Sequence, residues 1–400
     1  MTPVVQTLID AGQLAGAATL IWKDGVTRVE CAGWRDREAY LPVERDTLFR
    51  IASLSKPITS VAALMLVDEG LLALSDPIAR WAPEFTRMRV LRDPAGALDE
   101  AALRDTVPAE RQITVEDLLT HRSGLSYGSF WPGPIGDAYR ESLGGDIDTD
   151  RTPDEWIARL AALPLIDQPG ATLHYGQSVD LLGLLLARID RTSRGELLAR
   201  RIFGPLGMTD TGFIVPAAQR GRRACAYGFD DDGRLTRLSA GHAGAFRDER
   251  PEGMTFESGG AGLWSTLDDF LAFARLFVGG GAVDGVRILR PETIALMTTN
   301  TLAPAQRATA EVAGLPLFTA GHGFGLGVAV VMEPEHAEPL VCGGGVGAVG
   351  WPGAFGGWWR ADPNDGSVRI FLAHNMIARE QFAKGIGFGV YEAITAFQRA

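Results

Sequence analysis

Ser53 and Lys56 have the types and spacing needed for nucleophilic catalysis, at the two ends of the stretch SLSK. A serine hydroxyl is a weak nucleophile unless a neighbouring group takes its proton. Residues three apart lie on one face of a helix, so we expect Ser53, rather than Ser55, to face Lys56. The start of a helix also offers backbone N–H groups that can hold an oxyanion. The pattern predicts a serine nucleophile with a lysine base.

The choice of lysine at position 56 supports this interpretation. Three of the 38 basic residues are lysines (Lys23, Lys56 and Lys384), and the others are arginines. Burial and neighbouring charges can make an ammonium lose its proton, whereas a guanidinium keeps it. The S-x-x-K pattern is common, however, and an N-cap serine followed by a solvent-exposed lysine is the alternative interpretation.

A second serine, Ser126, lies in GLSYG, which fits the G-x-S-x-G nucleophile elbow. That elbow requires a strand before the serine and a helix after it. Here a predicted helix precedes Ser126, and a loop with Pro132 and Pro134 follows it. We therefore expect Ser126, Tyr127 and Trp131 to form a wall or lid of a binding site.

The elements around these residues change in type along the chain. Lys23-Asp24-Gly25 predicts a hairpin between two strands, and Gly70 predicts a left-handed end to a long apolar helix. Residues 124–152 are predicted to be a long loop. The patterns predict helices within 54–69, 114–125, 152–163, 178–190, 195–207, 265–281 and 381–398, and strands within 17–34, 324–332, 357–362 and 367–375.

Strands at both ends with helices between them predict an α+β fold, with an antiparallel sheet flanked by helices and an inserted, mostly helical domain. We assign residues 1–75 and 235–400 to the sheet domain and 76–234 to the helical domain. The active site is expected in the cleft between them.

Composition excludes several classes of function. A net charge of −11 and a pI near 5.1 argue against nucleic-acid or anionic-membrane partners. The N-terminus does not resemble a signal peptide and no run has the length of a membrane span, so we expect a cytoplasmic protein. The histidines are scattered without metal-ligand spacing, and we expect no metal site and no Ser/His/acid triad.

The motifs together resemble those of the serine β-lactamase/penicillin-binding-protein superfamily, and more narrowly the family VIII carboxylesterases, which are similar to class C β-lactamases. The resemblance covers nearly the whole chain. It rests on LFRIASLSKPITSVAALMLVDEG, TVEDLLTHRSGL, IFGPLGMTDTGF, GGAGLWSTLDDFLAFARLF, FGLGVAV and WPGAFGGWWRADP, in this order and spacing.

The resemblance implies a β-lactamase-like fold in which Ser53 is acylated with Lys56 as its partner. The family's Y-x-N motif corresponds to Tyr175-Gly176-Gln177, so Tyr175 joins Lys56 as the base pair, and a neighbouring ammonium favours its phenolate. Which of the two takes the first proton stays open. Gln177 replaces the usual asparagine, which argues against efficient β-lactam turnover.

The family's K-T-G motif corresponds to Trp351-Pro352-Gly353, on a strand that we expect at the edge of the cleft because it contains a proline. The backbone N–H groups of Ser53 and Ala354 are the implied oxyanion hole. Trp351, Gly353, Gln177 and Tyr127 are the implied substrate contacts, although Trp351 could instead be a core residue.

The resulting hypothesis is a serine carboxylesterase for short-chain acyl esters that needs no cofactor. Loss of the K-T-G lysine removes the cation that would bind a carboxylate, and an apolar indole suits a neutral ester. The alternatives are a β-lactamase, a D-amino-acid peptidase or an acyltransferase of the same fold. A non-catalytic penicillin-recognition-like binding module and an α/β-hydrolase using Ser126 are further alternatives. The oligomeric state stays unknown.

Overall fold

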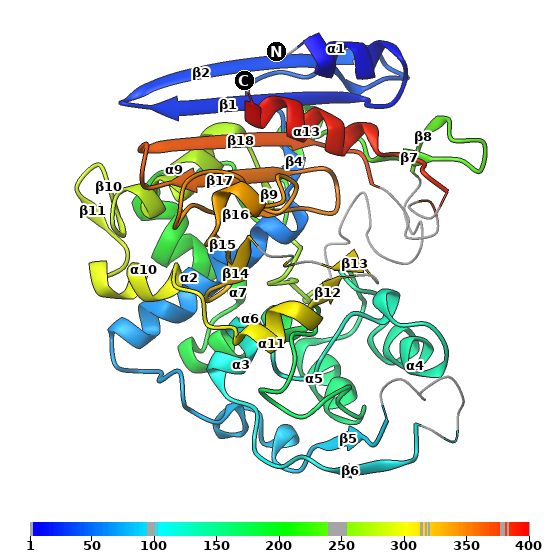
Figure 1. Cartoon of the computed structure of the whole chain (residues 1–400), viewed down its shortest axis with the longest axis vertical. Helices are drawn as coiled ribbons and strands as arrows, with labels where there is room; N and C mark the ends of the chain where they lie inside the picture. The colour runs from blue at the N-terminus through cyan, green and yellow to red at the C-terminus, as the bar shows by residue number, and fades with distance from the viewer. Residues whose placement is uncertain are drawn as a thin grey trace.

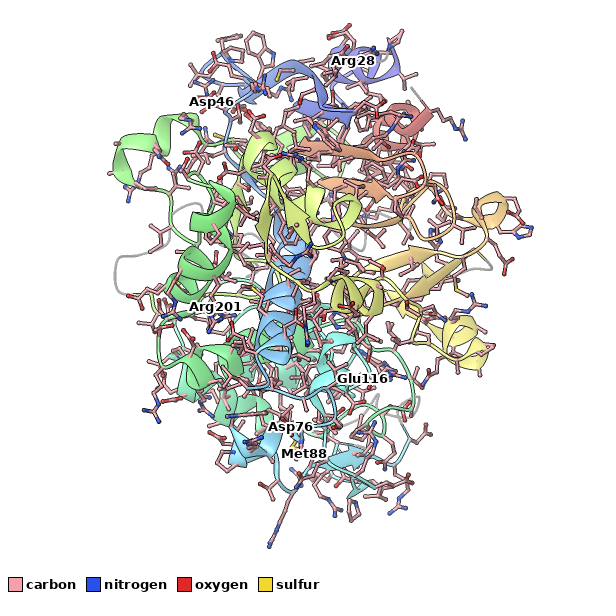
Figure 2. The ribbon with its side chains drawn as sticks, turned by 90° about the vertical axis from the view of Figure 1, so that its left-hand side faces the viewer. Arg28, Asp46, Asp76, Met88, Glu116 and Arg201 are labelled. Carbon is pink, nitrogen blue, oxygen red and sulfur yellow. The ribbon has the colours of Figure 1, made fainter. Side chains whose placement is uncertain are left out.

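The computed structural model describes residues 3–93, 101, 103–238, 254–312, 315–316, 318, 321–376, 381 and 384–399. Its main sheet lies at one end of the molecule and most of the helices lie toward the other end (Figure 1). In Figure 2, Arg28 on the sheet and Met88 below the helices mark these opposite ends. The α+β class is confirmed, while the division at residues 75 and 235 stays a prediction.

The main sheet has eight antiparallel strands and joins the two ends of the chain. In spatial order they are β14 (His322–Phe324), β15 (Ala329–Val331), β16 (Val349–Pro352), β17 (Trp358–Asp362), β18 (Ser367–Ala373), β1 (Gly16–Lys23), β2 (Val26–Asp36) and β3 (Leu41–Pro42). The predicted hairpin joins β1 to β2, with Asp24 and Gly25 at φ of 52° and 78°. Positive φ at both positions matches the twist of the flanking strands.

Helices cover both faces of the sheet. Because successive side chains on a strand point to opposite faces, neighbouring residues pack against different helices. On β17, Trp358 packs toward α1 (Pro3–Asp10) and α13 (Gly389–Arg399). Its neighbour Trp359 packs toward α9 (Leu267–Val278) on the other face. Two adjacent tryptophans therefore belong to two separate hydrophobic cores.

The helices away from the sheet are short and several have clear caps. They are α3 (Val115–Leu119), α4 (Pro134–Leu143), α5 (Pro153–Ala161), α6 (Ser178–Asp190), α7 (Arg194–Leu198) and α8 (Gly204–Leu206), with a π-helical segment at Ala199–Phe203. Thr114 and Thr152 cap α3 and α5 as capping boxes. α2 (Ser55–Asp68) packs against α6 and is followed by Gly70 in the predicted left-handed conformation.

Two local predictions were wrong. Residues 124–152 are not one long loop, because they contain α4, which has Pro134 at its start and Gly144 as a left-handed cap. Proline at the first position and glycine just after the last are typical of helix ends. The prediction of a loop relied on composition alone and did not use these two signals. The run FGLGVAVVM is not one strand, because Gly325–Val328 form the turn between β14 and β15.

The closing helix is shorter than predicted, since α13 begins at Gly389, and residues 382–383 of that prediction lie outside the described part of the chain. No helix in the described residues is long and apolar enough to cross a membrane.

Candidate active site

Ser53 lies in a one-turn 3₁₀ helix, Ala52–Leu54, directly before α2. It is therefore not on the α-helix itself, but its Oγ still accepts a hydrogen bond of 3.2 Å from Lys56 Nζ. Ala52 has a φ of 45°, which is uncommon for a residue with a Cβ. Such backbone strain concentrates at functional sites, and here it directly precedes the candidate nucleophile.

Lys56 is buried, with 1% of its surface exposed, so the interpretation of a solvent-exposed lysine is wrong. Its Nζ donates to Ser53 Oγ at 3.2 Å, to the Tyr127 hydroxyl at 3.0 Å and to the Gly260 carbonyl oxygen at 3.0 Å. An ammonium has three protons to donate. These three acceptors therefore satisfy the charged form of Lys56 completely.

Two tyrosines approach Lys56 in different ways. The Tyr127 hydroxyl bonds to the ammonium, whereas the ring of Tyr175 lies beneath it, with Nζ 4.5 Å from the ring centroid. Burial, together with Asp180, raises the pKa of Tyr127 well above its usual value, so Tyr127 is poorly suited to act as a base. The predicted substrate contact Tyr127 is thus a direct partner of Lys56.

The hydroxyl of Tyr175 points to the sheet. Trp351 Nε1 donates to it at 3.0 Å, and the two rings lie 5.3 Å apart. His121 supports Tyr175 from another side, with ring centroids 4.6 Å apart. Burial, and the charge of Lys56, lower the pKa of His121 far below its usual value, so His121 is neutral.

The segment after β16 approaches the turn that holds Ser53. A Cβ on Gly353 would lie 2.8 Å from the Ile51 carbonyl oxygen, so this close approach requires glycine. Ala354 follows in an exposed turn, and no acceptor among the described residues takes its N–H. A free N–H beside the serine turn is what an oxyanion hole requires.

Comparisons with known proteins bear on the family and the fold of the chain. The family model described as Beta-lactamase matches residues 1–385.

The chain belongs to the beta-lactamase family.

Relatives within this family are named as esterases. Esterase EstB of Burkholderia gladioli is 31% identical over 376 residues, covering 88% of this chain and 83% of EstB. An uncharacterized protein of Mycobacterium tuberculosis is 45% identical, covering 92% of this chain and 88% of the relative. The structure of EstCE1, described as a hydrolase with promiscuous acyltransferase activity, has a TM-score of 0.78 at 25% identity, covering 99% of this chain and 96% of EstCE1. The resemblance to family VIII carboxylesterases is confirmed, and the protein is a serine hydrolase of the beta-lactamase fold.

Trp351, which the resemblance aligns with the K-T-G lysine, lies on β16. That strand was predicted at an edge, and this prediction is wrong. β16 lies between β15 and β17, but β15 pairs only with Val349 and Gly350. Pro352 is therefore tolerated because its strand is unpaired on that side. Trp351 is also 3% exposed and packs on Phe324, so it combines the core role with the contact to Tyr175.

Gln177, at the asparagine position of the family's Y-x-N motif, is 1% exposed. Its Nε2 donates to Asp146 at 3.4 Å, and its Oε1 has no partner among the described residues. Burial raises the pKa of Asp146. The structure therefore places Gln177 near Asp146, and its role in binding substrate stays a prediction.

The two rival serines have structural bonds in this beta-lactamase-family fold. Ser55 Oγ accepts from the Leu263 N–H at 3.2 Å, and Ser126 Oγ donates to the Tyr175 carbonyl oxygen at 3.0 Å. Ser126 follows α3 and precedes a 3₁₀ turn, so it lacks the strand–turn–helix of a nucleophile elbow.

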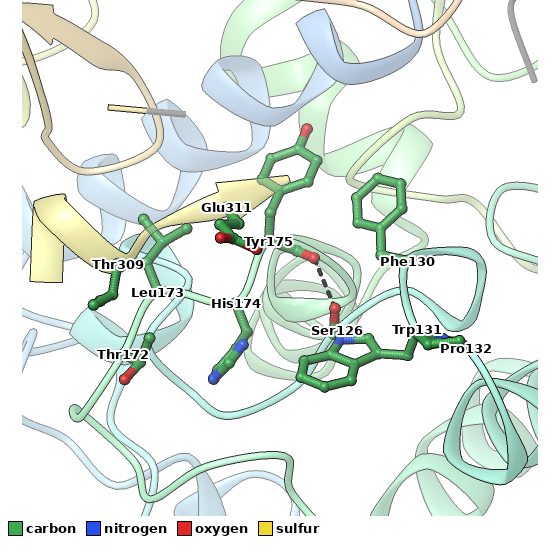
Figure 3. Close-up of a pocket in the computed structure, with 10 residues that line it drawn as sticks. All are labelled: Ser126, Phe130, Trp131, Pro132, Thr172, Leu173, His174, Tyr175, Thr309 and Glu311. Atoms are coloured by element: carbon green, nitrogen blue, oxygen red, sulfur yellow. Dashed lines mark hydrogen bonds between the residues drawn. The ribbon is translucent and has the colours of Figure 1, made fainter. Parts of the chain in front are cut away.

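Ser126 borders a cavity of about 250 Å³, with Trp131 and Tyr175 also in its wall (Figure 3). Ser126 and Trp131 thus line a cavity while Tyr127 does not, and a role of this wall in binding substrate stays a prediction.

Sequence reasoning missed Asp180 and Gly260. Asp180 is wholly buried on α6, five residues after Tyr175, and Gly260 supplies a carbonyl oxygen to Lys56. The sequence offered one indication, an acidic residue within the apolar helix SVDLLGLLLARID. A buried carboxylate requires nearby donors, and the chain supplies them from a distant loop.

Proposed function

We propose that the protein is a carboxylesterase that hydrolyses short-chain acyl esters through an acyl-enzyme on Ser53. The observation that carries the proposal is the hydrogen bond from Lys56 to Ser53 Oγ, next to a Tyr175–Trp351 pair where the family motif has a lysine. A cation at that position would bind a substrate carboxylate. The neutral indole favours an uncharged ester.

In the proposed reaction, Ser53 Oγ attacks the ester carbonyl carbon and its proton passes to the Lys56/Tyr175 pair. The N–H groups of Ser53 and Ala354 hold the tetrahedral oxyanion. When the oxyanion collapses, the C–O bond to the alcohol breaks and the pair returns the proton to the alkoxide. Water then gives a proton to the same pair and attacks the acyl carbon. When this second tetrahedral intermediate collapses, the bond from the acyl carbon to Ser53 Oγ breaks, the pair returns the proton to Oγ, and the acid leaves.

The central experiment compares hydrolysis of p-nitrophenyl butyrate and nitrocefin by the purified protein. We expect the ester to be hydrolysed with the higher kcat/KM, and faster nitrocefin hydrolysis would contradict the proposal. Ser53→Ala should lose the activity, while Ser60→Ala should keep it, because Ser60 is a buried serine on α2 whose Oγ has no hydrogen-bond partner among the described residues. Labelling with a fluorophosphonate should place the adduct on Ser53, and an adduct on Ser55 or Ser126 would contradict the assignment.

Acyl transfer is the second candidate function, and the described activity of EstCE1 favours it. In that reaction an alcohol replaces water as the acceptor of the acyl group on Ser53. The test adds a primary alcohol to the p-nitrophenyl butyrate assay and measures butyrate ester against free butyrate. An ester yield above that expected from the molar ratio of alcohol to water indicates a transferase.

A further inference from the structure

Asp180 is a carboxylate buried beside the candidate site that touches neither Ser53 nor Lys56. It accepts hydrogen bonds from Ser258 Oγ at 2.5 Å, from the Gly260 N–H at 3.0 Å and from the Tyr127 hydroxyl at 3.4 Å. None of these three donors carries a charge, and the guanidinium of the buried Arg194 donates to the backbone carbonyl oxygen of Asp180 at 3.5 Å. A fully buried negative charge is costly unless a positive charge compensates it nearby.

Two of the three donors lead directly to Lys56. The Gly260 N–H donates a hydrogen bond to Asp180, and the Gly260 carbonyl oxygen accepts one from Lys56 Nζ at 3.0 Å. Tyr127 donates its proton to Asp180, which leaves its oxygen free to accept from Lys56 Nζ at 3.0 Å. Two bridges of one residue each therefore connect the carboxylate to the ammonium.

The chain around these bridges is closely fitted. A Cβ on Gly260 would lie 2.5 Å from Asp180 Oδ2 and 3.0 Å from the Tyr127 hydroxyl oxygen. Thr59 on α2 donates to the Gly259 carbonyl oxygen at 2.8 Å, so the loop is fixed from the helix of Lys56 as well. These contacts fix the position of Gly260 between Asp180 and Lys56.

We propose that Asp180 is a positioning residue that holds Lys56 as an ammonium next to Ser53. It directs two acceptors toward Nζ and supplies the negative charge that favours the protonated amine. The inference deepens the proposed function, because it assigns to Lys56 the role of a cation in the resting site.

In the described part of the chain, the other titratable groups that face Lys56 are Tyr127, Tyr175 and His121, with Asp146 behind Tyr127. The buried cation Arg194 lies on the backbone side of Asp180, where it donates to the carbonyl oxygen. Burial keeps His121 neutral and favours the protonated form of Asp146. Asp180 is the carboxylate that reaches Lys56 through these bridges, and its removal is the informative change.

The scarcity of lysine makes Lys56 directly observable. Protein labelled with ¹³C at lysine Cε should give three signals by NMR, which Lys23→Arg and Lys384→Arg assign. The Asp180 carboxylate and the Lys56 ammonium are separated by about two hydrogen-bond lengths. At an effective dielectric constant of about 20, one unit charge at that distance changes the titration midpoint of the other group by about two pH units. We expect the midpoint of Lys56 to fall by about that amount in Asp180→Asn.

Asp269→Asn is the matched control. Asp269 is also a buried helix carboxylate that accepts one backbone N–H, from Asp210, and one hydroxyl, from Thr211. The Asp269→Asn variant should keep the Lys56 midpoint within a few tenths of a pH unit of the wild-type value. If Asp180→Asn does not fold, Tyr127→Phe removes one bridge and should lower the midpoint by a smaller amount.

The inference is contradicted if the Lys56 midpoint is unchanged in folded Asp180→Asn or Tyr127→Phe. It is also contradicted if Lys56 gives an ammonium signal at every pH in both the wild type and the variant. The NMR titration needs no substrate, so it decides the role of Asp180 even if the ester assay fails. In the assay, the alkaline limb of kcat, where the Lys56 ammonium loses its proton, should move to lower pH in Asp180→Asn and not in Asp269→Asn. A purely structural role for Asp180 would lower kcat without moving that limb.

Discussion

The indole N–H of Trp351 donates a hydrogen bond of 3.0 Å to the hydroxyl oxygen of Tyr175. One residue comes from the sheet and the other from the segment before α6, so this bond joins the two parts of the candidate site. In the motif alignment that the resemblance implies, the apolar ring of Trp351 stands where the family has a cation. The first prediction follows from this bond.

Trp351→Phe removes the N–H and keeps an aromatic ring. A hydrogen bond to a charged group is worth about 1.5–3 kcal/mol, so we expect kcat for p-nitrophenyl butyrate to fall about 10- to 100-fold. Trp358→Phe is the control, because Trp358 is a buried tryptophan on the neighbouring strand whose N–H has no partner among the described residues. Equal losses in both variants would show that packing, and not the bond, matters.

Lys56→Arg keeps the charge and changes its geometry. The planar guanidinium cannot direct three donors from one nitrogen to Ser53, Tyr127 and Gly260. We expect kcat to fall by about 10²- to 10⁴-fold, the usual contribution of proton transfer by a positioned group. Lys23→Arg and Lys384→Arg should keep full activity, and an active Lys56→Arg enzyme would argue against a role for Lys56.

Gly260→Ala places a methyl group between Asp180 and Tyr127. Because that methyl would lie 2.5 Å from a carboxylate oxygen, the loop must move and the Lys56 acceptor moves with it. We expect loss of most esterase activity and a stability loss of about 1–3 kcal/mol by urea unfolding. In Gly221→Ala the new methyl meets nothing within 4 Å, so activity and stability should be retained.

His374 predicts a pH dependence of stability. Burial, and the nearby charge of Arg50, lower its pKa to about 3. An unfolded histidine titrates near pH 6.5, so between these values the unfolded chain binds a proton that the folded chain does not. The stability from neutral His374 is complete above pH 6.5 and is lost toward pH 3, by about 1.4 kcal/mol per pH unit.

The corresponding measurement is urea unfolding from pH 6 to pH 4 in wild type and His374→Gln. The slope of unfolding free energy against pH should be shallower in the variant by about one proton's contribution. His336→Gln, at an exposed position, should keep the wild-type slope. Parallel slopes in wild type and His374→Gln would show that His374 titrates normally in the folded protein.

Local patterns in the sequence predicted the parts of the fold that depend on neighbouring residues. The hairpin at Asp24-Gly25, the caps at Thr114 and Thr152 and the end of α2 at Gly70 are each determined by short-range chemistry. The same holds for Ser53 and Lys56, which are three residues apart. α4 was not predicted, because the segments around it are rich in polar residues and glycine, and its terminal proline and glycine were interpreted as loop residues.

The remainder of the site depends on contacts between distant segments. Tyr127 and Tyr175 both lie before helices, and no spacing rule says which one bonds to Lys56. The motif resemblance identified Tyr175, yet the hydrogen bond belongs to Tyr127. Asp180 and Gly260 are 80 residues apart, and their contact is formed only in the folded chain.

The position of β1 in the sheet has a consequence for synthesis of the protein. β1 pairs with β2 on one side and with β18 on the other, where Ala17 lies opposite Ala373. On the ribosome, the hairpin of β1 and β2 is made before β18, and most of the helices and the other strands of the sheet lie between them in the sequence. We expect the sheet to close only after β18 has been translated, so chains truncated before β18 would expose the edge of β1 and aggregate.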